Sequence, residues 1–358
     1  MQNNKQNKNT GNCKSDKNNK NKFNNKNIKN NYGTNENASL KAMLANAGIT
    51  LKKSLGQNFL IEPKIPFKIA DSIEKSLLKT SFNGNSFKEI PLKDTAFKNA
   101  EHENSHSENS GCYDKKSDVG VIEIGPGAGV LTKELAKRFK KVVCIELDTR
   151  MEPILNKNLS GFSNVEFIFN DVLKVDLKKV TNNLLKTCKQ VVVAANLPYY
   201  ITSPIIMYIL ESKLNIQSVT VMVQKEAAER ICAKIPSRNV GAVTIAVNYY
   251  STAEILFGVS KNCFLPPPNV ESAVIRLNIR KEPLFLNINE QNFFKLVKAS
   301  FIHRRKTLVN SVSSALNINK EIVLNALKAE NLPCTVRAEN LSLNNFANIS
   351  EYIFKNNL

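Results

Sequence analysis

A side-chain amide and an aromatic ring stand together where an apolar run ends. The β-branched residues 191–193 precede Asn196-Leu197-Pro198-Tyr199 and predict a short buried strand, which the proline ends because it cannot donate to a β-ladder. Amide and carbonyl oxygens can accept hydrogen bonds from an exocyclic amine while a ring stacks on the attached base. The stretch is therefore a candidate site for chemistry on a nucleobase. Taken alone, it is equally compatible with a turn in which Tyr199 fills the core.

A glycine loop and a carboxylate occur at the ends of two earlier strands. Gly125, Gly127 and Gly129 follow the apolar run at 119–124 and permit a tight turn at the N-terminus of the next helix. Glu146 ends the following strand, where a carboxylate can bind both hydroxyls of a ribose. Many dinucleotide-binding folds share a glycine loop, but an acid two residues before the first glycine and this glycine spacing differ from the dinucleotide fingerprint. The two strand ends predict nucleoside binding.

A third strand ends at Asn170-Asp171. The carboxyl ends of parallel strands meet at one edge of an α/β sheet, which is where ligands bind. Gly125, Glu146, Asp171 and Asn196 are therefore expected to line one crevice. In it, Glu146 would bind the ribose of a nucleoside and Asp171 the adenine amine.

The elements that must position these residues form a βαβ pattern. A helix is expected from about Pro63 to Leu78, and from residue 119 onward apolar runs alternate with stretches of helical spacing, which predicts a doubly wound sheet. The later elements are expected as a helix at 203–210, a strand at 218–223, a helix from 224, a strand near 243–250 and a strand at 272–279. Residues 266–268 are three prolines, a stiff segment that either holds Phe264 at a fixed height above the pocket or connects two domains.

Composition divides the 358 residues into three parts. Residues 1–37 are rich in Asn and Lys and are expected to be a disordered tail, because they cannot bury enough apolar surface to offset the entropy of ordering. Residues 38–281 carry the α/β pattern, interrupted by a polar stretch at 79–118 that we interpret as a mobile surface insertion. Residues 282–358 are purely helical in pattern and predict a small helical domain.

Charge and cysteine content restrict the partners. The net charge of +19 favours nucleic acid over an anionic membrane surface, and no apolar run is long enough to cross a bilayer. The seven cysteines include no C-x-x-C pair, which indicates reduced core thiols and argues against a zinc site. In the helical domain, Arg304, Arg305 and Lys306 are candidate RNA phosphate contacts, although a run of charges is more often a solvated face.

Seven short motifs occur in a fixed order along the chain. They are Leu55–Leu60, Glu123–Gly129, Asn196–Tyr199, Gln224–Glu226, Pro266–Pro268 with Val270 and Ser272, Arg304–Thr307 and Arg337–Glu339. Together they resemble the S-adenosylmethionine-dependent rRNA adenine N6,N6-dimethyltransferases of the KsgA/Dim1 type. The resemblance covers about residues 51–350.

The resemblance implies a seven-stranded Rossmann-like methyltransferase sheet with a small C-terminal all-helical domain. It implies S-adenosylmethionine as cofactor and dimethylation of two adjacent adenosines near the 3′ end of small-subunit (16S) rRNA. The implied partner is the pre-30S ribosomal particle, with a role in ribosome biogenesis. The implied enzyme is a cytoplasmic monomer that uses neither metal nor membrane. An organelle as the working compartment stays open, as do the exact target adenosines.

Site residues are carried over from the resemblance position by position. The expected cofactor-binding residues are Asn58, Leu60, Gly125, Gly127, Glu146, Asp171 and Asn196. The expected catalytic residues are Asn196, Pro198, Tyr199 and Phe264: the Asn196 side chain and the Pro198 carbonyl accept from the adenine amine, and the two rings stack on the base. Residues 240–244 and His303 depart from the family's usual residues and are expected to alter RNA contacts only.

Three alternative functions remain at this point. A resistance methyltransferase acting on one large-subunit adenosine is disfavoured by the helical domain with its basic run at 303–307 and by the sequence of residues 196–200. A ribosome-assembly factor or transcription cofactor without turnover is disfavoured by the complete crevice, although a structural role beside catalysis is compatible with it. A nicotinamide oxidoreductase is disfavoured by the glycine spacing.

Overall fold

The computed structural model describes residues 58–82 and 116–355. The expected tail at 1–37, the first part of the expected α/β domain and most of the insertion expected at 79–118 lie outside the described residues. The two ends of the expected insertion that the structure describes belong to regular elements instead. At one end α2 (Lys64–Phe82) continues as a helix through Phe82, and at the other β2 begins at Ser117. No helix in the described ranges is long and apolar enough to cross a membrane.

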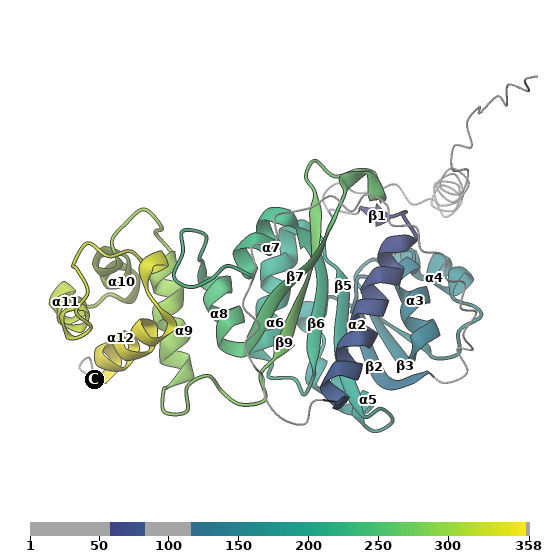
Figure 1. The fold of residues 1–358 in the computed structure, drawn as a ribbon, viewed down its shortest axis with the longest axis horizontal. Helices are drawn as coiled ribbons and strands as arrows, with labels where there is room; N and C mark the ends of the chain where they lie inside the picture. The colour runs from purple at the N-terminus through teal and green to yellow at the C-terminus, as the bar shows by residue number, and fades with distance from the viewer. Residues whose placement is uncertain (1–57, 83–115, 356–358) are drawn as a thin grey trace, which may run out of the picture.

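Seven strands form one sheet in the order β4-β3-β2-β5-β6-β9-β7 (Figure 1). The strands from β4 to β6 run parallel, whereas β9 is antiparallel to both of its neighbours. The strands are β2 (Ser117–Ile124), β3 (Phe139–Glu146), β4 (Val165–Phe169), β5 (Gln190–Asn196), β6 (Ser218–Gln224), β7 (Ser251–Val259) and β9 (Ser272–Ile279). The predicted seven-stranded sheet is confirmed.

The central strands β2 and β5 are buried on both faces, as expected for parallel strands covered by helices. Their register pairs Ile124 with Ala195, so the residues that follow, Gly125 and Asn196, meet at the carboxyl edge of the sheet. A Cβ on Gly125 would lie 4.0 Å from the backbone oxygen of Asn196. The register thus brings the predicted glycine loop beside the predicted amide.

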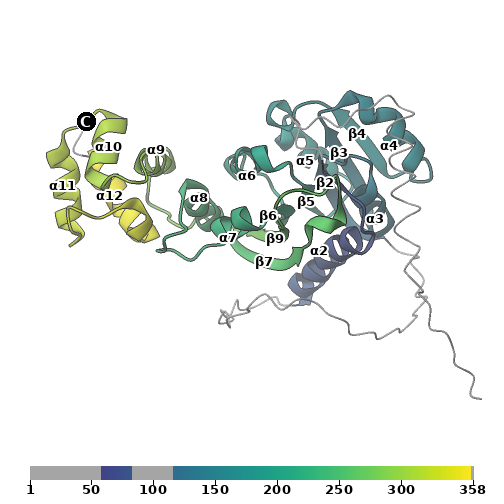
Figure 2. The ribbon, with the colours of Figure 1, turned by 90° about the horizontal axis from the view of Figure 1, so that it is seen from above.

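Helices cover both faces of the sheet (Figure 2). On one face, α2 and α3 (Val130–Arg138) pack over alternate residues of the central strands, Val121 and Val192 among them. On the other face, α5 (Leu177–Leu185) and α6 (Thr202–Glu211) pack over Ile122 and Val193. Two short helices, α4 (Glu152–Asn158) and α7 (Lys225–Ile231), complete this part of the chain.

The C-terminal helices form a separate lobe beside the sheet (Figure 1). They are α9 (Glu290–Phe301), α10 (Leu308–Leu316), α11 (Lys320–Ala329) and α12 (Leu343–Lys355). Their core is apolar and includes Phe293 and Phe346, both fully buried. This agrees with the predicted helical domain.

The strand expected near 243–250 is wrong. Those residues form a helix, α8 (Ala242–Tyr250), and the strand is the next segment, β7. The helix lies between the sheet and the helical lobe: Val247 packs with the sheet core, whereas Ile245 and Tyr249 pack with the lobe. A helix buried on several sides is apolar all round, so its periodicity cannot be told from that of a buried strand.

A small second sheet brings distant segments together. Strand β1 (Phe59–Leu60) pairs antiparallel with β8 (Phe264–Leu265), so that Leu60 faces Phe264. The pairing places the segment before α2 beside the segment before the triple proline.

Candidate active site

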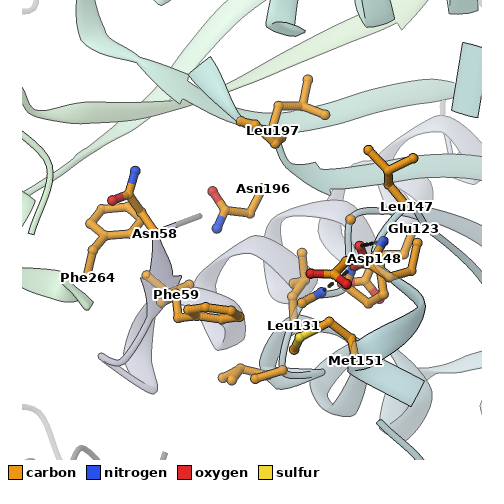
Figure 3. Close-up of a pocket in the computed structure, with 18 of the residues that line it drawn as sticks. Asn58, Phe59, Glu123, Leu131, Leu147, Asp148, Met151, Asn196, Leu197 and Phe264 are labelled. Atoms are coloured by element: carbon orange, nitrogen blue, oxygen red, sulfur yellow. Dashed lines mark hydrogen bonds between the residues drawn. The ribbon is translucent and has the colours of Figure 1, made fainter. Parts of the chain in front are cut away.

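A cavity opens at the carboxyl ends of β2, β3 and β5 and is closed on one side by the β1–β8 pair (Figure 3). Most of the predicted cofactor-binding and catalytic residues line it: Asn58, Leu60, Gly125, Gly127, Glu146, Asn196, Pro198, Tyr199 and Phe264. Asp171 is the exception. Its carboxylate accepts a hydrogen bond from the backbone N–H of Leu173 at 3.0 Å and caps a short 3-10 turn just beyond β4. Its role toward a bound adenine stays a prediction.

The floor of the cavity is the glycine loop. Gly127 has a φ of +56°, a conformation that side-chain-bearing residues rarely adopt, and a Cβ there would lie 3.3 Å from the ring of Phe59. Phe59 is buried and is held over the loop by the β1–β8 pairing. Backbone and ring thus fit closely, and a side chain at this position would have to displace the Phe59 ring slightly.

Glu146 is fixed by two backbone donors. Its Oε2 accepts from the N–H of Gly127 at 3.2 Å and its Oε1 accepts from the N–H of Asp148 at 2.9 Å (Figure 3). The side chain is buried, and burial raises the pKa of its carboxyl above the usual range. Each carboxylate oxygen can accept more than one hydrogen bond, so the group retains capacity for the two hydroxyls of a ribose.

A second acid lies beneath the loop. Glu123 is 1% exposed, and burial raises the pKa of its carboxyl to about 7. The thiol of Cys144 lies 3.5 Å from its Oε2, and the negative charge of Glu146 adds to the rise in pKa. Glu123 lines the cavity, although the sequence suggested it only as part of the glycine motif.

The amide of Asn196 points into the cavity, toward Asn58 and Phe264 (Figure 3). Within residues 58–82 and 116–355, no group forms a hydrogen bond with it. The carbonyl of Pro198 was expected to accept from the adenine amine. It already accepts from the N–H of Ile201 and the hydroxyl of Thr202, both at 3.2 Å. The neighbouring carbonyl of Leu197 accepts no hydrogen bond from any described residue and also belongs to the cavity wall.

Aromatic rings occupy three places around this amide. Tyr199 is half-buried and its hydroxyl lies 2.8 Å from that of Ser272. Phe264 is only 2% exposed and forms a wall of the cavity. Tyr200, which was not among the predicted site residues, also lines the cavity and is 57% exposed.

The remaining wall was not predicted. It includes Phe59, Leu131, Leu147, Asp148 and Met151. Asp148, two residues after Glu146, could have been selected from the same strand end, whereas the apolar residues give no signal in the sequence that separates them from core. No group of three or more metal-ligating side chains occurs in the described part of the chain.

The basic triplet lies away from the cavity, in the turn between α9 and α10. The guanidinium of Arg304 donates to the backbone carbonyls of Arg238 and Val240 at 3.3 and 3.4 Å. Arg304 therefore links the helical lobe to the segment before α8. Arg305 and Lys306 are exposed, and RNA contact by all three stays a prediction.

The family described as ribosomal RNA adenine dimethylase matches residues 48–355. The chain belongs to this family. Its relatives include ribosomal RNA small subunit methyltransferase A of Bacillus pumilus, 40% identical over 318 residues, which are 88% of this chain and 95% of the relative. The same-named protein of Geobacillus thermodenitrificans is 41% identical over 313 residues, 87% of this chain and 93% of the relative.

Solved structures agree with this assignment. A dimethyladenosine transferase from Plasmodium falciparum is 28% identical, with a TM-score of 0.56 over 68% of this dimethylase and 92% of that chain. The 23S rRNA methyltransferase ErmE, at 22% identity, has a TM-score of 0.53 over 83% of this chain and 100% of its own, which is a likeness of fold. The predicted family, fold and enzyme class are thus confirmed, and the nicotinamide oxidoreductase alternative is excluded.

Proposed function

We propose that this dimethylase transfers methyl groups from S-adenosylmethionine to N6 of two adjacent adenosines near the 3′ end of small-subunit rRNA. The observation that carries the proposal is the amide of Asn196, which has no hydrogen-bond partner among the described residues and points into the cavity that the glycine loop and Glu146 also line. The part of the wall with the glycine loop and Glu146 suits a nucleoside-containing cofactor, and the part with Asn196 suits an amine. When bound, S-adenosylmethionine supplies an activated methyl group on a sulfonium.

The cofactor side is built from groups held in place by the fold. Glu146, fixed by two backbone N–H donors, would bind the ribose hydroxyls, and the backbone at Gly125 and Gly127 would allow close approach. Asn58 and Leu60 would close the site from the β1–β8 side. Asp171 would bind the adenine amine from the rim, next to the end of β3.

The target amine would be held by two oxygens. The Asn196 side chain is one acceptor, and the carbonyl of Leu197 is the other, because the Pro198 carbonyl is already engaged within its turn. Two acceptors on the N–H groups would draw the nitrogen lone pair out of conjugation with the ring and direct it at the methyl group. As the new N–C bond forms, the S–C bond of the sulfonium would break and leave a neutral thioether, and the amine would release its proton to solvent. Alignment of this kind can supply several kcal/mol of the barrier.

The base itself would be held by stacking. Tyr199, with its ring fixed through Ser272, would stack on an adenine extruded from its RNA, with Phe264 as the wall beside it. Stacking of a base on an aromatic side chain contributes about 1–3 kcal/mol. The monomethylated amine can turn in the same site and react again, which accounts for two methyl groups.

The substrate class follows from the relatives and the charge. The relatives quoted above are named for the small ribosomal subunit, and a net charge of +19 suits a polyanionic particle. The proposed partner is the pre-30S particle, reached in the cytoplasm by a monomer, with residues 38–281 as the catalytic domain and 282–358 as the RNA-contacting domain. Arg305 and Lys306 would contribute to that contact.

Mass-spectrometric mapping of methylated adenosines tests the proposal. The full chain is incubated with S-adenosylmethionine and unmethylated small subunits, with naked large-subunit rRNA as the comparison. Two dimethylated adenosines in the 3′-terminal hairpin are the expected product. Methylation elsewhere, with that hairpin unmodified, would overturn the substrate assignment.

A further inference from the structure

Tyr200 is a large exposed side chain that lines the catalytic cavity. It is 57% exposed, which places it at the rim of the cavity rather than in its interior. Within the described ranges its ring contacts no other aromatic ring and its hydroxyl forms no hydrogen bond. A single exposed aromatic on an ordinary surface needs no functional explanation, whereas this one stands at the opening of the cavity that holds the amide of Asn196.

The pair Tyr249-Tyr250, at the end of α8, shows how consecutive tyrosines pack in the interior. Their ring centroids lie 4.9 Å apart in an edge contact, and Tyr250 also stacks on Phe294 with centroids 5.3 Å apart. The hydroxyl of Tyr250 donates to the carboxylate of Glu290 at 2.8 Å. Tyr200 has neither kind of partner among the described residues, so more than half of its side chain is available to a ligand.

The turn that carries Tyr200 is fixed by the backbone. Residues 199–201 form a short 3-10 helix, and the N–H of Ile201 donates to the carbonyl of Pro198 at 3.2 Å. A 3-10 helix has three residues per turn, so consecutive side chains project in directions about 120° apart. The hydroxyl of Tyr199 lies beside that of Ser272, and Tyr200 therefore points in a different direction while still lining the cavity.

An adenosine bound at Asn196 leaves its neighbours in the RNA outside the cavity. Extruding one base from a stack exposes a face of the base next to it, and that face loses the stacking energy it had. The neighbouring nucleotide is joined to the target through one phosphate, so its base must lie close to the rim. An aromatic ring at the rim can stack on any such base, because every base has a π-face.

We propose that Tyr200 stacks on the base next to the target adenosine. The enzyme then holds two consecutive bases, one against Tyr199 inside the cavity and one against Tyr200 at the rim. The identity of the RNA rests on the proposed function, in which the two target adenosines are neighbours. Tyr200 is thus a residue that presents the strand to the cavity, separate from the groups that hold the amine.

Substitutions at Tyr200 test the need for the ring. With Tyr200→Ala, we expect the KM for unmethylated small subunits to rise about 5- to 30-fold with little change in kcat, because stacking outside the cavity is equal before and during methyl transfer. Tyr200→Phe keeps the ring and should match wild type, since the hydroxyl has no partner among the described residues. Both variants should keep the wild-type Tm and the wild-type Kd for S-adenosylmethionine.

Leu78→Ala is the control for these substitutions. Leu78 lies on α2 outside the cavity and has the same exposed fraction as Tyr200, 57%. The control should match wild type in KM, kcat, Tm and cofactor affinity.

A substrate that lacks the neighbouring base tests the contact itself. Small subunits are reconstituted with rRNA that carries an abasic site on the 5′ or the 3′ side of one target adenosine, and methylation of that adenosine is measured. On one of the two sides, the abasic site is expected to raise the KM of the wild type about as much as Tyr200→Ala does on intact RNA. Tyr200→Ala should then lose nothing further on that substrate, because the two changes remove one interaction.

Three results would overturn the proposal. They are an unchanged KM for Tyr200→Ala on intact subunits, an equal loss from Tyr200→Ala on the intact and on both abasic substrates, and a raised Kd for S-adenosylmethionine that accounts for the whole loss. The last result would assign the ring to the cofactor. The proposed function is judged separately, by which adenosines the wild type methylates, and the abasic substrates are built around whichever adenosines those are.

Discussion

The hydroxyl of Tyr199 lies 2.8 Å from the hydroxyl of Ser272, a residue 73 positions later in the chain. Ser272 is buried at the start of β9, opposite the last residue of β6 and the last residue of β7. The bond joins the loop after β5 to the antiparallel end of the sheet. This hydrogen bond fixes the plane of the Tyr199 ring before any substrate arrives. Burial also raises the pKa of the Tyr199 hydroxyl.

Substitutions at Tyr199 separate the ring from its hydroxyl. Tyr199→Ala removes the stacking surface, so kcat/KM for small-subunit methylation is expected to fall about 5- to 150-fold, the equivalent of 1–3 kcal/mol. Tyr199→Phe keeps the ring and removes one hydrogen bond, so a loss of only a few-fold is expected. Steady-state methyl transfer to small subunits provides the measurement.

Ser272→Ala is the matched partner of Tyr199→Phe. If the hydroxyl acts only through this bond, each single variant and the double variant Tyr199→Phe/Ser272→Ala lose the same amount, because the two changes remove one interaction. Additive losses would show that one of the hydroxyls has a role of its own.

Much of this site was predictable, because it lies at strand ends. β-branched runs mark parallel strands and the parallel arrangement brings their carboxyl ends together, so Gly125, Glu146 and Asn196 were placed correctly beside one another. Phe59 and Leu131 were missed, since an apolar residue that lines a cavity has the same sequence pattern as one in the core.

Tertiary contacts decided what the sequence left open. The run at 243–250 could be strand or helix, and its burial between sheet and lobe made it α8. The carbonyl of Pro198 was expected to face the amine, but a 3-10 turn engages it. Arg304 was expected to contact RNA, which stays a prediction, and the contacts of its guanidinium with the carbonyls of Arg238 and Val240 were not foreseen. Each of these three features depends on contacts with residues distant in the sequence or on a local turn that has no characteristic residue type.

Asn196→Ala should lower methyl transfer far more than it lowers cofactor binding. The amide oxygen would interact with the amine as it attacks, so kcat is expected to fall about 100-fold, the usual scale for a hydrogen-bonding group at a reacting centre. The measurements are single-turnover methylation of small subunits and calorimetric titration with S-adenosylmethionine. Asn262→Ala, at an exposed asparagine outside the cavity, is the control and should match wild type. Near-normal methylation by Asn196→Ala would contradict the assignment.

Gly127→Ala should weaken cofactor binding. Gly127 has a φ of +56° and a Cβ would lie 3.3 Å from the Phe59 ring, so the variant loses about 1–2 kcal/mol in backbone strain and must displace the ring. An increase of about 10-fold in the Kd for S-adenosylmethionine is expected by calorimetry. Gly161→Ala is the control, since a Cβ there meets nothing within 4 Å and its φ is not in the left-handed region. Equal Kd values for the two variants would show that the loop is not the cofactor cradle.

We expect the folded protein to become less stable as the pH rises toward neutrality, because the carboxyl of Glu123 must then ionise while buried. Its carboxyl has a pKa of about 7 in the fold, because it is buried, and 4.5 as an ordinary glutamate. Between these values the folded state binds more protons than the unfolded state, so the free energy of unfolding falls as the pH rises. The shift corresponds to about 3 kcal/mol lost by pH 8. The neighbouring carboxyl of Glu146 and thiol of Cys144 also have raised pKa values, and that of Glu146 acts in the same direction.

Glu123→Gln removes the titrating group while keeping the side-chain shape. In urea unfolding at pH 5, 6, 7 and 8, the free energy of unfolding of the variant should decline less than that of wild type, and the difference between the two should grow with pH until about pH 8. Glu166→Gln, at an exposed acid of β4, is the control and should follow the wild-type curve closely. Parallel curves for wild type and Glu123→Gln would mean that Glu123 is already ionised well below neutrality, and that the glycine loop rests on a permanent negative charge.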